Sequence, residues 1–199
     1  MDVLILMGHP NQQSFVAALA DSYVNGVQSA KASVQIIKLG ELNFDPSLHQ
    51  GYRAIQTLEP DLLMATEAIR SAKHLAFFYP QWWGSAPAIL KGFIDRTFLP
   101  GFAFKYHQKG PWWDRLLTGR TAEIWLTSDS PRIWCWVMYR DSAIKWLKSA
   151  TLEFSGVKPV KVTTLNSVKT MSEAKRRRWI QASYNKGRSV GLKFAGSSS

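Results

Sequence analysis

Short apolar runs alternate with helical stretches along most of the chain, and this alternation constrains the fold more than any other feature. The runs are rich in β-branched or aromatic residues and have the length of buried strands: 3–7, 34–38, 74–79, 121–127 and 160–164. Between them, apolar residues recur at intervals of three and four, which is typical of amphipathic helices. Strand–helix repeats of this kind pair in parallel through right-handed crossovers, with helices on both faces of the sheet.

The helical stretches complete this pattern: 15–22, 62–69, 89–97 and 144–154. A last, basic helix is expected to begin after Ser172, whose hydroxyl could cap it. We therefore predict one α/β domain over residues 1–195, a three-layer sandwich whose five parallel strands follow the order 2-1-3-4-5. Residues 196–199 form a small polar tail that we expect to fray.

Composition narrows the class of protein. The chain has 25 Lys and Arg against 14 Asp and Glu, a formal net charge of +11, which favours anionic partners. Cys135 is the only cysteine, which excludes an internal disulfide and a CxxC metal or dithiol site. The N-terminus lacks the basic region of a signal peptide, and no segment has the roughly 20 apolar residues that membrane insertion of a helix requires. We expect a cytoplasmic protein without a metal site.

The basic run at 175–178 raises the alternative of nucleic-acid binding. No helix-turn-helix, RRM or zinc pattern accompanies it, and a basic run is usually a solvated helix face. We therefore expect no nucleic-acid partner.

In an open parallel sheet, ligands bind beyond the carboxyl ends of the strands, where the strand order reverses. That point lies between the first and third strands, so the loops at 8–15 and 79–88 would face each other. The first loop, GHPNQQSF, opens a helix whose free N–H groups suit a phosphate. Ser14 could add a hydroxyl and His9 a donor; the alternative is that Asn11 and Ser14 only cap the helix.

The second loop, YPQWWGSAPA, holds two adjacent tryptophans, Trp82 and Trp83. Pro80 and Pro87 stiffen its backbone, and Gly84 permits a close approach. Indole faces can stack on a flat ligand, and the alternative is that the pair packs in the core. Because consecutive side chains point in different directions, we expect at least one to reach the crevice or a partner subunit.

A third loop, TSDSPRIWCW, follows the fourth strand and would border the same crevice. Thr127 and Ser128 supply hydroxyls there, and Asp129 supplies a carboxylate. Taken alone, these residues favour an ordinary turn.

Together the loops resemble the flavodoxin-like NAD(P)H:quinone oxidoreductases, the family of the NAD(P)H dehydrogenases (quinone) and the modulator-of-drug-activity proteins. The matching segments follow the family's order over residues 1–165: Gly8-His9-Pro10, Ser14-Phe15, Pro80-Gln81-Trp82-Trp83, Pro87-Ala88-Ile89-Leu90-Lys91-Gly92, Asp95-Arg96, Gly101-Phe102-Ala103-Phe104 and Leu152-Glu153-Phe154-Ser155-Gly156. The third loop departs from the pattern, because Asp129-Ser130 stands where the family has Gly-Gly. The charge-relay residues of the larger quinone reductases are therefore not carried over.

The resemblance implies a flavoprotein in which NAD(P)H reduces the bound flavin and a quinone or similar acceptor then takes the hydride. We favour FMN over FAD because the chain is short and lacks an evident adenine site. The family is usually homodimeric, which implies contacts between subunits through residues 87–106. The alternative that the resemblance leaves open is a flavin-binding ancillary subunit of a potassium efflux system. An electron carrier is disfavoured, because flavodoxins are acidic.

The resemblance also assigns site residues. The flavin's phosphate region would be held by four of them: His9, Ser14, Phe15 and Val16. The ring system would be bordered by seven more, with Trp82 against the ring: Pro80, Gln81, Trp82, Trp83, Thr127, Ser128 and Asp129. No catalytic side chain is assigned, because the flavin carries the chemistry. Gln81 and Tyr106 are candidates to orient a quinone oxygen.

Overall fold

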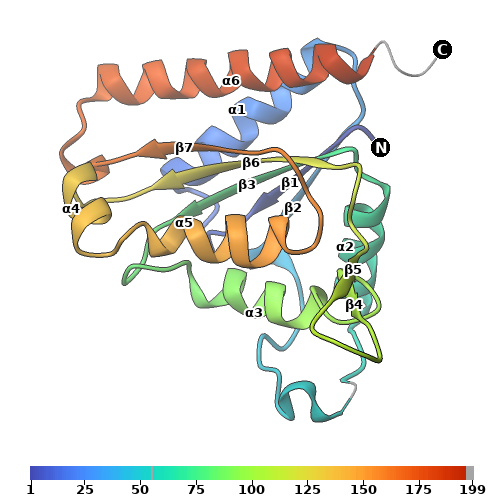
Figure 1. Cartoon of the computed structure of the whole chain (residues 1–199). Helices are drawn as coiled ribbons and strands as arrows, with labels where there is room; N and C mark the ends of the chain where they lie inside the picture. Colours follow the sequence, from blue (N-terminus) through green and yellow to red (C-terminus); the bar gives the residue numbers. More distant parts are fainter. Residues whose placement is uncertain (55, 196–199) are drawn as a thin grey trace.

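The main sheet has five parallel strands in the order β2-β1-β3-β6-β7 (Figure 1). Their bounds are Val3–Met7 (β1), Val34–Lys38 (β2), His74–Pro80 (β3), Thr121–Thr127 (β6) and Val160–Leu165 (β7). The computed structural model describes residues 1–54 and 56–195, so the predicted tail at 196–199 lies outside the described residues. The five parallel strands match the predicted segments to within one residue, and the predicted order 2-1-3-4-5 is confirmed.

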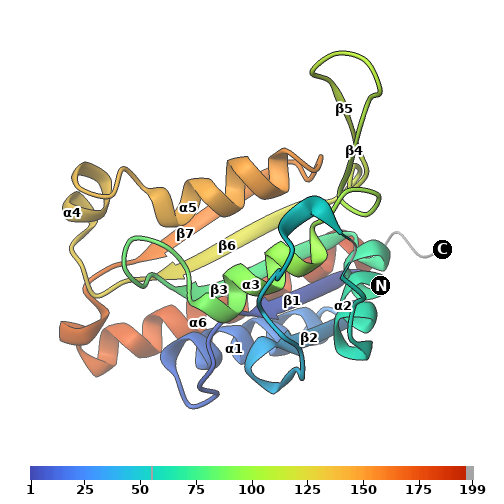
Figure 2. The ribbon, with the colours of Figure 1, turned by 90° about the horizontal axis from the view of Figure 1, so that it is seen from below.

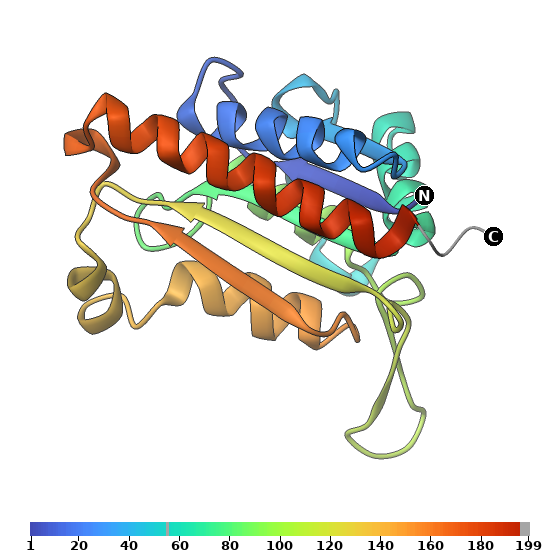
Figure 3. The ribbon, with the colours of Figure 1, turned by 90° about the horizontal axis from the view of Figure 1, so that it is seen from above.

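Helices cover both faces of the sheet, as predicted (Figures 2 and 3). Two lie on one face, α1 (Phe15–Ser29) and α6 (Glu173–Ala195), and three pack on the other, α2 (Pro60–Ser71), α3 (Ala88–Thr97) and α5 (Ser142–Leu147). Side chains of β1 alternate between the two cores, with Ile5 on the α1 side and Leu6 opposite. Both β1 and β3 are buried along their whole length, which explains their continuous apolar sequences.

Several elements were not predicted. A short helix, α4, spans Arg132–Val137, and α5 continues as a π-helical turn over Lys148–Glu153 rather than as one α-helix. Strands β4 (Phe104–Tyr106) and β5 (Trp113–Arg115) form an antiparallel hairpin that projects from the body (Figure 2). Three-residue strands are too short to show a periodic pattern in sequence.

Four single-turn segments complete the described secondary structure. Besides the π-helical turn, these are three short 3-10 turns: Leu39–Glu41, Gly51–Arg53 and Val168–Thr170. Of the described helices, none has the length and apolar character needed to cross a membrane.

Helix α6 packs on α1 at very short range through glycines. A Cβ atom at Gly187 would lie 2.2 Å from the carbonyl oxygen of Tyr23, and one at Gly26 would lie 2.1 Å from that of Tyr184. No side chain fits at such distances, so the two backbones touch. This contact fixes the position of α1, whose first turn lies at the carboxyl end of the sheet.

We expect Gly187→Ala to lower the free energy of unfolding by about 1–3 kcal/mol, because the new methyl group overpacks the contact. The effect opposes the gain of about 1 kcal/mol that alanine gives in an open helix. Urea unfolding measures it, with Ser189→Ala on the exposed side of α6 as the control. A Gly187→Ala protein as stable as the wild type would mean that the helices do not touch here.

A buried polar cluster also joins this layer to the sheet. The Tyr23 hydroxyl donates to Glu123 Oε2 at 3.3 Å and lies 3.4 Å from His74 Nε2. Lys186 on α6 pairs with Glu123 at 2.9 Å, and His74 Nδ1 lies 2.6 Å from the hydroxyl of Thr121. Burial, with Lys186 among the nearby cations, lowers the pKa of His74 from 6.5 to about 4. The ring is therefore neutral in the folded protein near pH 7.

Because the pKa of His74 is lower in the folded chain than in the unfolded chain, protonation favours unfolding. The contribution of neutral His74 to the free energy of unfolding is fully present above pH 6.5 and decreases as the pH falls toward 4. Between pH 7 and 4.5 we expect a loss of about 2–3 kcal/mol in unfolding free energy. Urea unfolding of the wild type and of His74→Gln at both pH values measures it. The variant should lose less, and equal losses in the two proteins would refute the assignment.

Candidate functional site

A cavity of about 210 Å³ lies where the β1, β3 and β6 strands end. It is lined by residues of three loops and by one residue near the start of α6: His9, Ser14, Phe15, Val16, Pro80, Gln81, Trp82, Thr127, Ser128, Asp129 and Val168. Backbone bonds join the loops, because the Gly8 N–H donates to the Phe78 carbonyl and the Gln81 N–H donates to the Thr127 carbonyl. The predicted reversal of strand order between β1 and β3 thus forms a real crevice.

Every residue predicted to bind the cofactor lines this cavity except Trp83. Their roles in binding remain predictions, but the structure brings them together from segments far apart in sequence. Tyr106 is also absent from this cavity and lies in a different one. Sequence reasoning missed Val168, a plain valine without a local signal of function.

Ser14 caps α1, since its Oγ accepts a hydrogen bond from the Ala17 N–H at 3.2 Å. A serine hydroxyl can accept one bond and still donate another. The first turn of a helix also leaves its N–H groups, here those of Phe15 and Val16, without intrahelical partners. Capping and anion binding, which the sequence left as alternatives, are therefore compatible at this residue.

His9 and Asn11 shape the rest of the first loop. The Asn11 N–H donates to His9 Nδ1 at 2.9 Å, so a neutral His9 ring carries its proton on Nε2. Partial burial lowers the pKa of His9 from its ordinary value. The Asn11 side chain accepts from the Gln13 N–H in a local turn, so Ser14 and not Asn11 caps the helix. His9 thus offers one ring N–H donor beside the first turn of α1.

The two tryptophans occupy a tight turn that separates them. Trp82 and Ser85 exchange backbone hydrogen bonds of 3.0 and 2.9 Å, while Trp83 (φ +49°) and Gly84 (φ +71°) adopt the left-handed backbone conformation of a type I′ turn. Trp82 lines the cavity, with its ring edge-to-face to His9 at 5.6 Å, whereas Trp83 is 100% exposed. A bulky residue in this conformation is strained by about 1–3 kcal/mol. The prediction that one indole of the pair reaches the crevice agrees with this geometry.

The third loop is both an ordered turn and a wall of the cavity. Ser128 Oγ accepts from the Ser130 N–H at 3.1 Å, and Asp129 Oδ1 accepts from the Lys169 N–H at 2.9 Å. Next to this wall, the Arg176 guanidinium lies 5.2 Å above the Phe15 ring. The prediction that the 175–178 run is a solvated helix face is therefore wrong for Arg176, which is half-buried, while Lys175, Arg177 and Arg178 are exposed. The side chain places a positive charge behind the first turn of α1.

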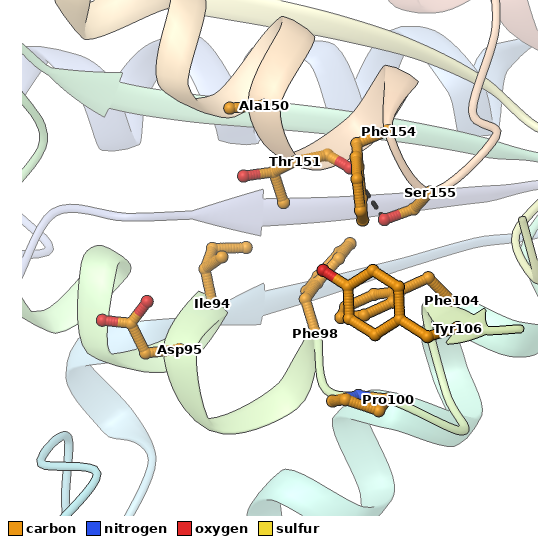
Figure 4. Close-up of a pocket in the computed structure, with 10 residues that line it drawn as sticks. All are labelled: Ile94, Asp95, Phe98, Pro100, Phe104, Tyr106, Ala150, Thr151, Phe154 and Ser155. Carbon is orange, nitrogen blue, oxygen red and sulfur yellow. Dashed lines mark hydrogen bonds between the residues drawn. The ribbon is translucent and has the colours of Figure 1, made fainter. Parts of the chain in front are cut away.

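A second cavity, of about 510 Å³, lies between α3, the β4–β5 hairpin and the π-helical turn (Figure 4). Four of its ten lining residues are aromatic, and the Phe104 ring lies 5.1 Å from both Tyr106 and Phe154. The other lining residues are Ile94, Asp95, Phe98, Pro100, Ala150, Thr151 and Ser155. In one chain, Tyr106 therefore cannot be assigned to the crevice at β1 and β3. Within the described residues, no group of three His, Cys, Asp or Glu side chains could hold a metal ion.

Comparison with known proteins identifies the family to which this fold belongs. The model of a family described as having a flavodoxin-like fold matches residues 1–186. This chain belongs to that flavodoxin-like family. The family resemblance and the fold class inferred from the three loops and the strand pattern are thereby confirmed.

The relatives of this flavodoxin-like protein include oxidoreductases. An uncharacterised NAD(P)H oxidoreductase of Haemophilus influenzae is 35% identical over 109 residues, which is 53% of this chain and 54% of that protein. The chain spans about half the length of the first curated relatives that it matches.

Solved structures match over nearly the whole flavodoxin-like chain. A protein from Streptococcus mutans is 30% identical with a TM-score of 0.77, covering 95% of this chain and 100% of that one. The NAD(P)H:quinone oxidoreductase of Methanothermobacter marburgensis is 26% identical with a TM-score of 0.81, covering 94% of this chain and 98% of that one.

The two roles of Ser14 can be separated by substitution. Asp caps a helix as well as Ser but cannot donate to a phosphate, which it also repels. We expect Ser14→Asp to keep the thermal unfolding midpoint and to weaken FMN binding about 10- to 100-fold, while riboflavin, which lacks the phosphate, binds as before.

Ser14→Ala serves as the comparison, because it removes both roles. It should also destabilise the protein by about 1 kcal/mol. Fluorescence titration measures both ligands. Unchanged FMN affinity in Ser14→Asp would exclude a phosphate at this helix end.

Proposed function

We propose that this chain is a flavin-dependent NAD(P)H oxidoreductase that delivers two electrons to a quinone or similar acceptor. The observation that carries the proposal is the crevice between β1 and β3, whose wall combines the first turn of α1 with the indole of Trp82. Relatives bearing the names NAD(P)H oxidoreductase and NAD(P)H:quinone oxidoreductase support the same activity. The proposal includes a cytoplasmic location, as the sequence suggested.

The residues of the crevice fit FMN. The first turn of α1 and the Ser14 hydroxyl suit a phosphate, and Trp82 offers an aromatic face to a flat ring system. Bound flavin would supply the chemistry of taking a hydride from NAD(P)H and giving it to the acceptor. FAD shares the same first phosphate and is the alternative cofactor.

The chain's own contribution is to bind and orient. Edge-to-face contact with His9 restrains the Trp82 ring, so a ligand stacked on it is held in one orientation. Gln81 lines the same cavity, and its amide could hold an acceptor oxygen. Transfer of a hydride between stacked rings needs no general base from the protein, and we assign none.

We also propose a homodimer through residues 87–106, as the resemblance implies. These residues supply much of the aromatic wall of the second cavity, where the Tyr106 side chain is more than half exposed. Exposed aromatic residues are enriched in protein interfaces. In such a dimer, Tyr106 would act on an acceptor bound in the crevice of the partner subunit.

The first experiment is an absorption spectrum of the purified protein, with and without added FMN. Flavin bands that anaerobic NADPH bleaches and a quinone restores are the expected result. Trp82→Ala should weaken the binding of FMN and riboflavin alike by about tenfold, because the lost contact is to the ring system.

The neighbouring variant Trp83→Ala is the matched control. Its side chain is fully exposed and does not line the cavity, so flavin affinity should not change. A protein that binds neither FMN nor FAD on titration would refute the proposed cofactor. Flavin binding without reduction by NADH or NADPH would refute the proposed activity.

A further inference from the structure

Helix α6 leaves part of the sheet uncovered at the edge strand β7. Gly187 and Gly191 hold α6 close to α1, since a Cβ atom at Gly191 would lie 2.8 Å from the Ala30 Cβ. In this position α6 runs beside α1 and does not extend over β7 (Figure 3). Val160 and Val162 pack in the core on the other face of the sheet, so Lys161 between them points to the α6 side and is exposed.

A cavity of about 190 Å³ lies beside this uncovered strand, at the amino ends of β3, β6 and β7. His74 and Ala122 contribute to its wall from the first residues of β3 and β6. Val190 and Phe194 contribute from the last turns of α6, where they lie four positions apart and share one face of the helix. The crevice lies at the carboxyl ends of the strands, so the two cavities are at opposite ends of the sheet.

Two lysines without a carboxylate partner line the cavity. These are Lys161 and Lys193, and among the ion pairs formed within residues 1–54 and 56–195 neither of them takes part. Besides burial, the main cause, the charges of Lys186, Lys193 and Lys161 lower the pKa of His74. All three ammonium groups therefore lie near this part of the sheet.

One acid, Glu123, also lines the cavity, but both of its oxygens are occupied. Oε1 pairs with Lys186 at 2.9 Å, and Oε2 accepts the hydrogen bond of the Tyr23 hydroxyl. Lys186 balances this carboxylate, and the His74 ring is neutral near pH 7. The charges of Lys161 and Lys193 are therefore left to attract an anion from solution.

The rest of the cavity wall is largely apolar. Ala122, Pro159, Val190 and Phe194 supply this part, and the Phe194 ring lies 6.2 Å from that of His74. An apolar cavity of about 150 Å³ is large enough for benzene. The space here therefore suits one ring or a short branched chain together with a carboxylate.

We propose that this cavity binds a small organic monocarboxylate, with its apolar body against Val190 and Phe194 and its carboxylate at Lys161 and Lys193. A few polar groups that fix one end of a ligand, beside an apolar wall for the rest, are typical of small-molecule sites. Inorganic phosphate would leave the apolar wall without a partner, and a neutral ring would leave the two cations without one. The ligand class therefore needs both features.

The homodimer proposed above leaves this cavity accessible. Helix α3 and the β4–β5 hairpin lie on the face of the sheet opposite α6, where they pack in a separate core (Figures 1 and 2). Of the described residues 87–106, none lines the cavity. Binding of the carboxylate depends neither on flavin nor on the proposed oxidoreductase activity.

The test is a titration of the full chain with benzoate, followed through the backbone amide signals in NMR spectra. We expect saturable shifts at Ala122, Val190 and Phe194, with a dissociation constant on the order of 1 mM. Excess FMN, which the crevice would take, should leave these shifts unchanged. Benzamide, which lacks the charge, and inorganic phosphate, which lacks the ring, should each bind at least about fivefold more weakly.

The double variant Lys161→Gln/Lys193→Gln should weaken benzoate binding about fivefold or more, because it removes both cations. Both side chains are exposed, so the fold should be kept. The matched control is Lys175→Gln/Arg178→Gln, which removes the same charge about 20 Å away along α6 and should bind benzoate like the wild type.

Three results would overturn the proposal. The first is a wild-type protein whose shifts do not saturate at the cavity, or are confined to crevice residues such as Ser14 and Trp82. The second is benzamide or phosphate that binds at the cavity as tightly as benzoate. The third is equal benzoate affinity in the two double variants, which would mean that Lys161 and Lys193 do not hold the carboxylate.

Discussion

Burial of β1 and β3 on both faces is the constraint on which the rest of this structure depends. A central parallel strand has no solvent-facing side, so nearly every position in these strands is apolar. The groups that line the crevice are therefore supplied mainly by the loops that follow the strands. Because the chain moves to opposite sides of β1 when it forms β2 and β3, the loops after β1 and β3 are left uncovered. The crevice is a direct result of that reversal.

Backbone geometry then decides which side chains line the crevice. The Ser14 hydroxyl accepts a hydrogen bond from the Ala17 N–H in the first turn of α1, and its own proton stays available to a ligand. One side chain can therefore both cap the helix and bind a ligand. The type I′ turn at Trp83 and Gly84 sends adjacent indoles to different surroundings, one into the cavity and one into solvent. Strain in the Trp83 backbone is maintained by the cross-turn bonds and by Tyr139 against Gly84.

The two ends of the sheet carry different surfaces. The carboxyl end carries the loops of the crevice, helix α4 and the start of the basic helix α6, while the β4–β5 hairpin lies toward the other end (Figures 1 and 2). The hairpin supplies part of the wall of the second cavity. Close packing of α6 on α1 through Gly26 and Gly187 fixes the position of the helix whose first turn borders the crevice.

The sequence by itself determined the strands, their order and most of the crevice, because strand burial and turn chemistry leave local patterns that can be read from residue types. His9, Ser14 and Trp82 were found this way. Tertiary structure alone decided that Trp83 turns outward, that Tyr106 lies in another cavity, and that Val168 lines the crevice from about 150 residues beyond its first loop. Such contacts depend on how distant helices pack, and packing at a distance leaves no periodic signal in the chain.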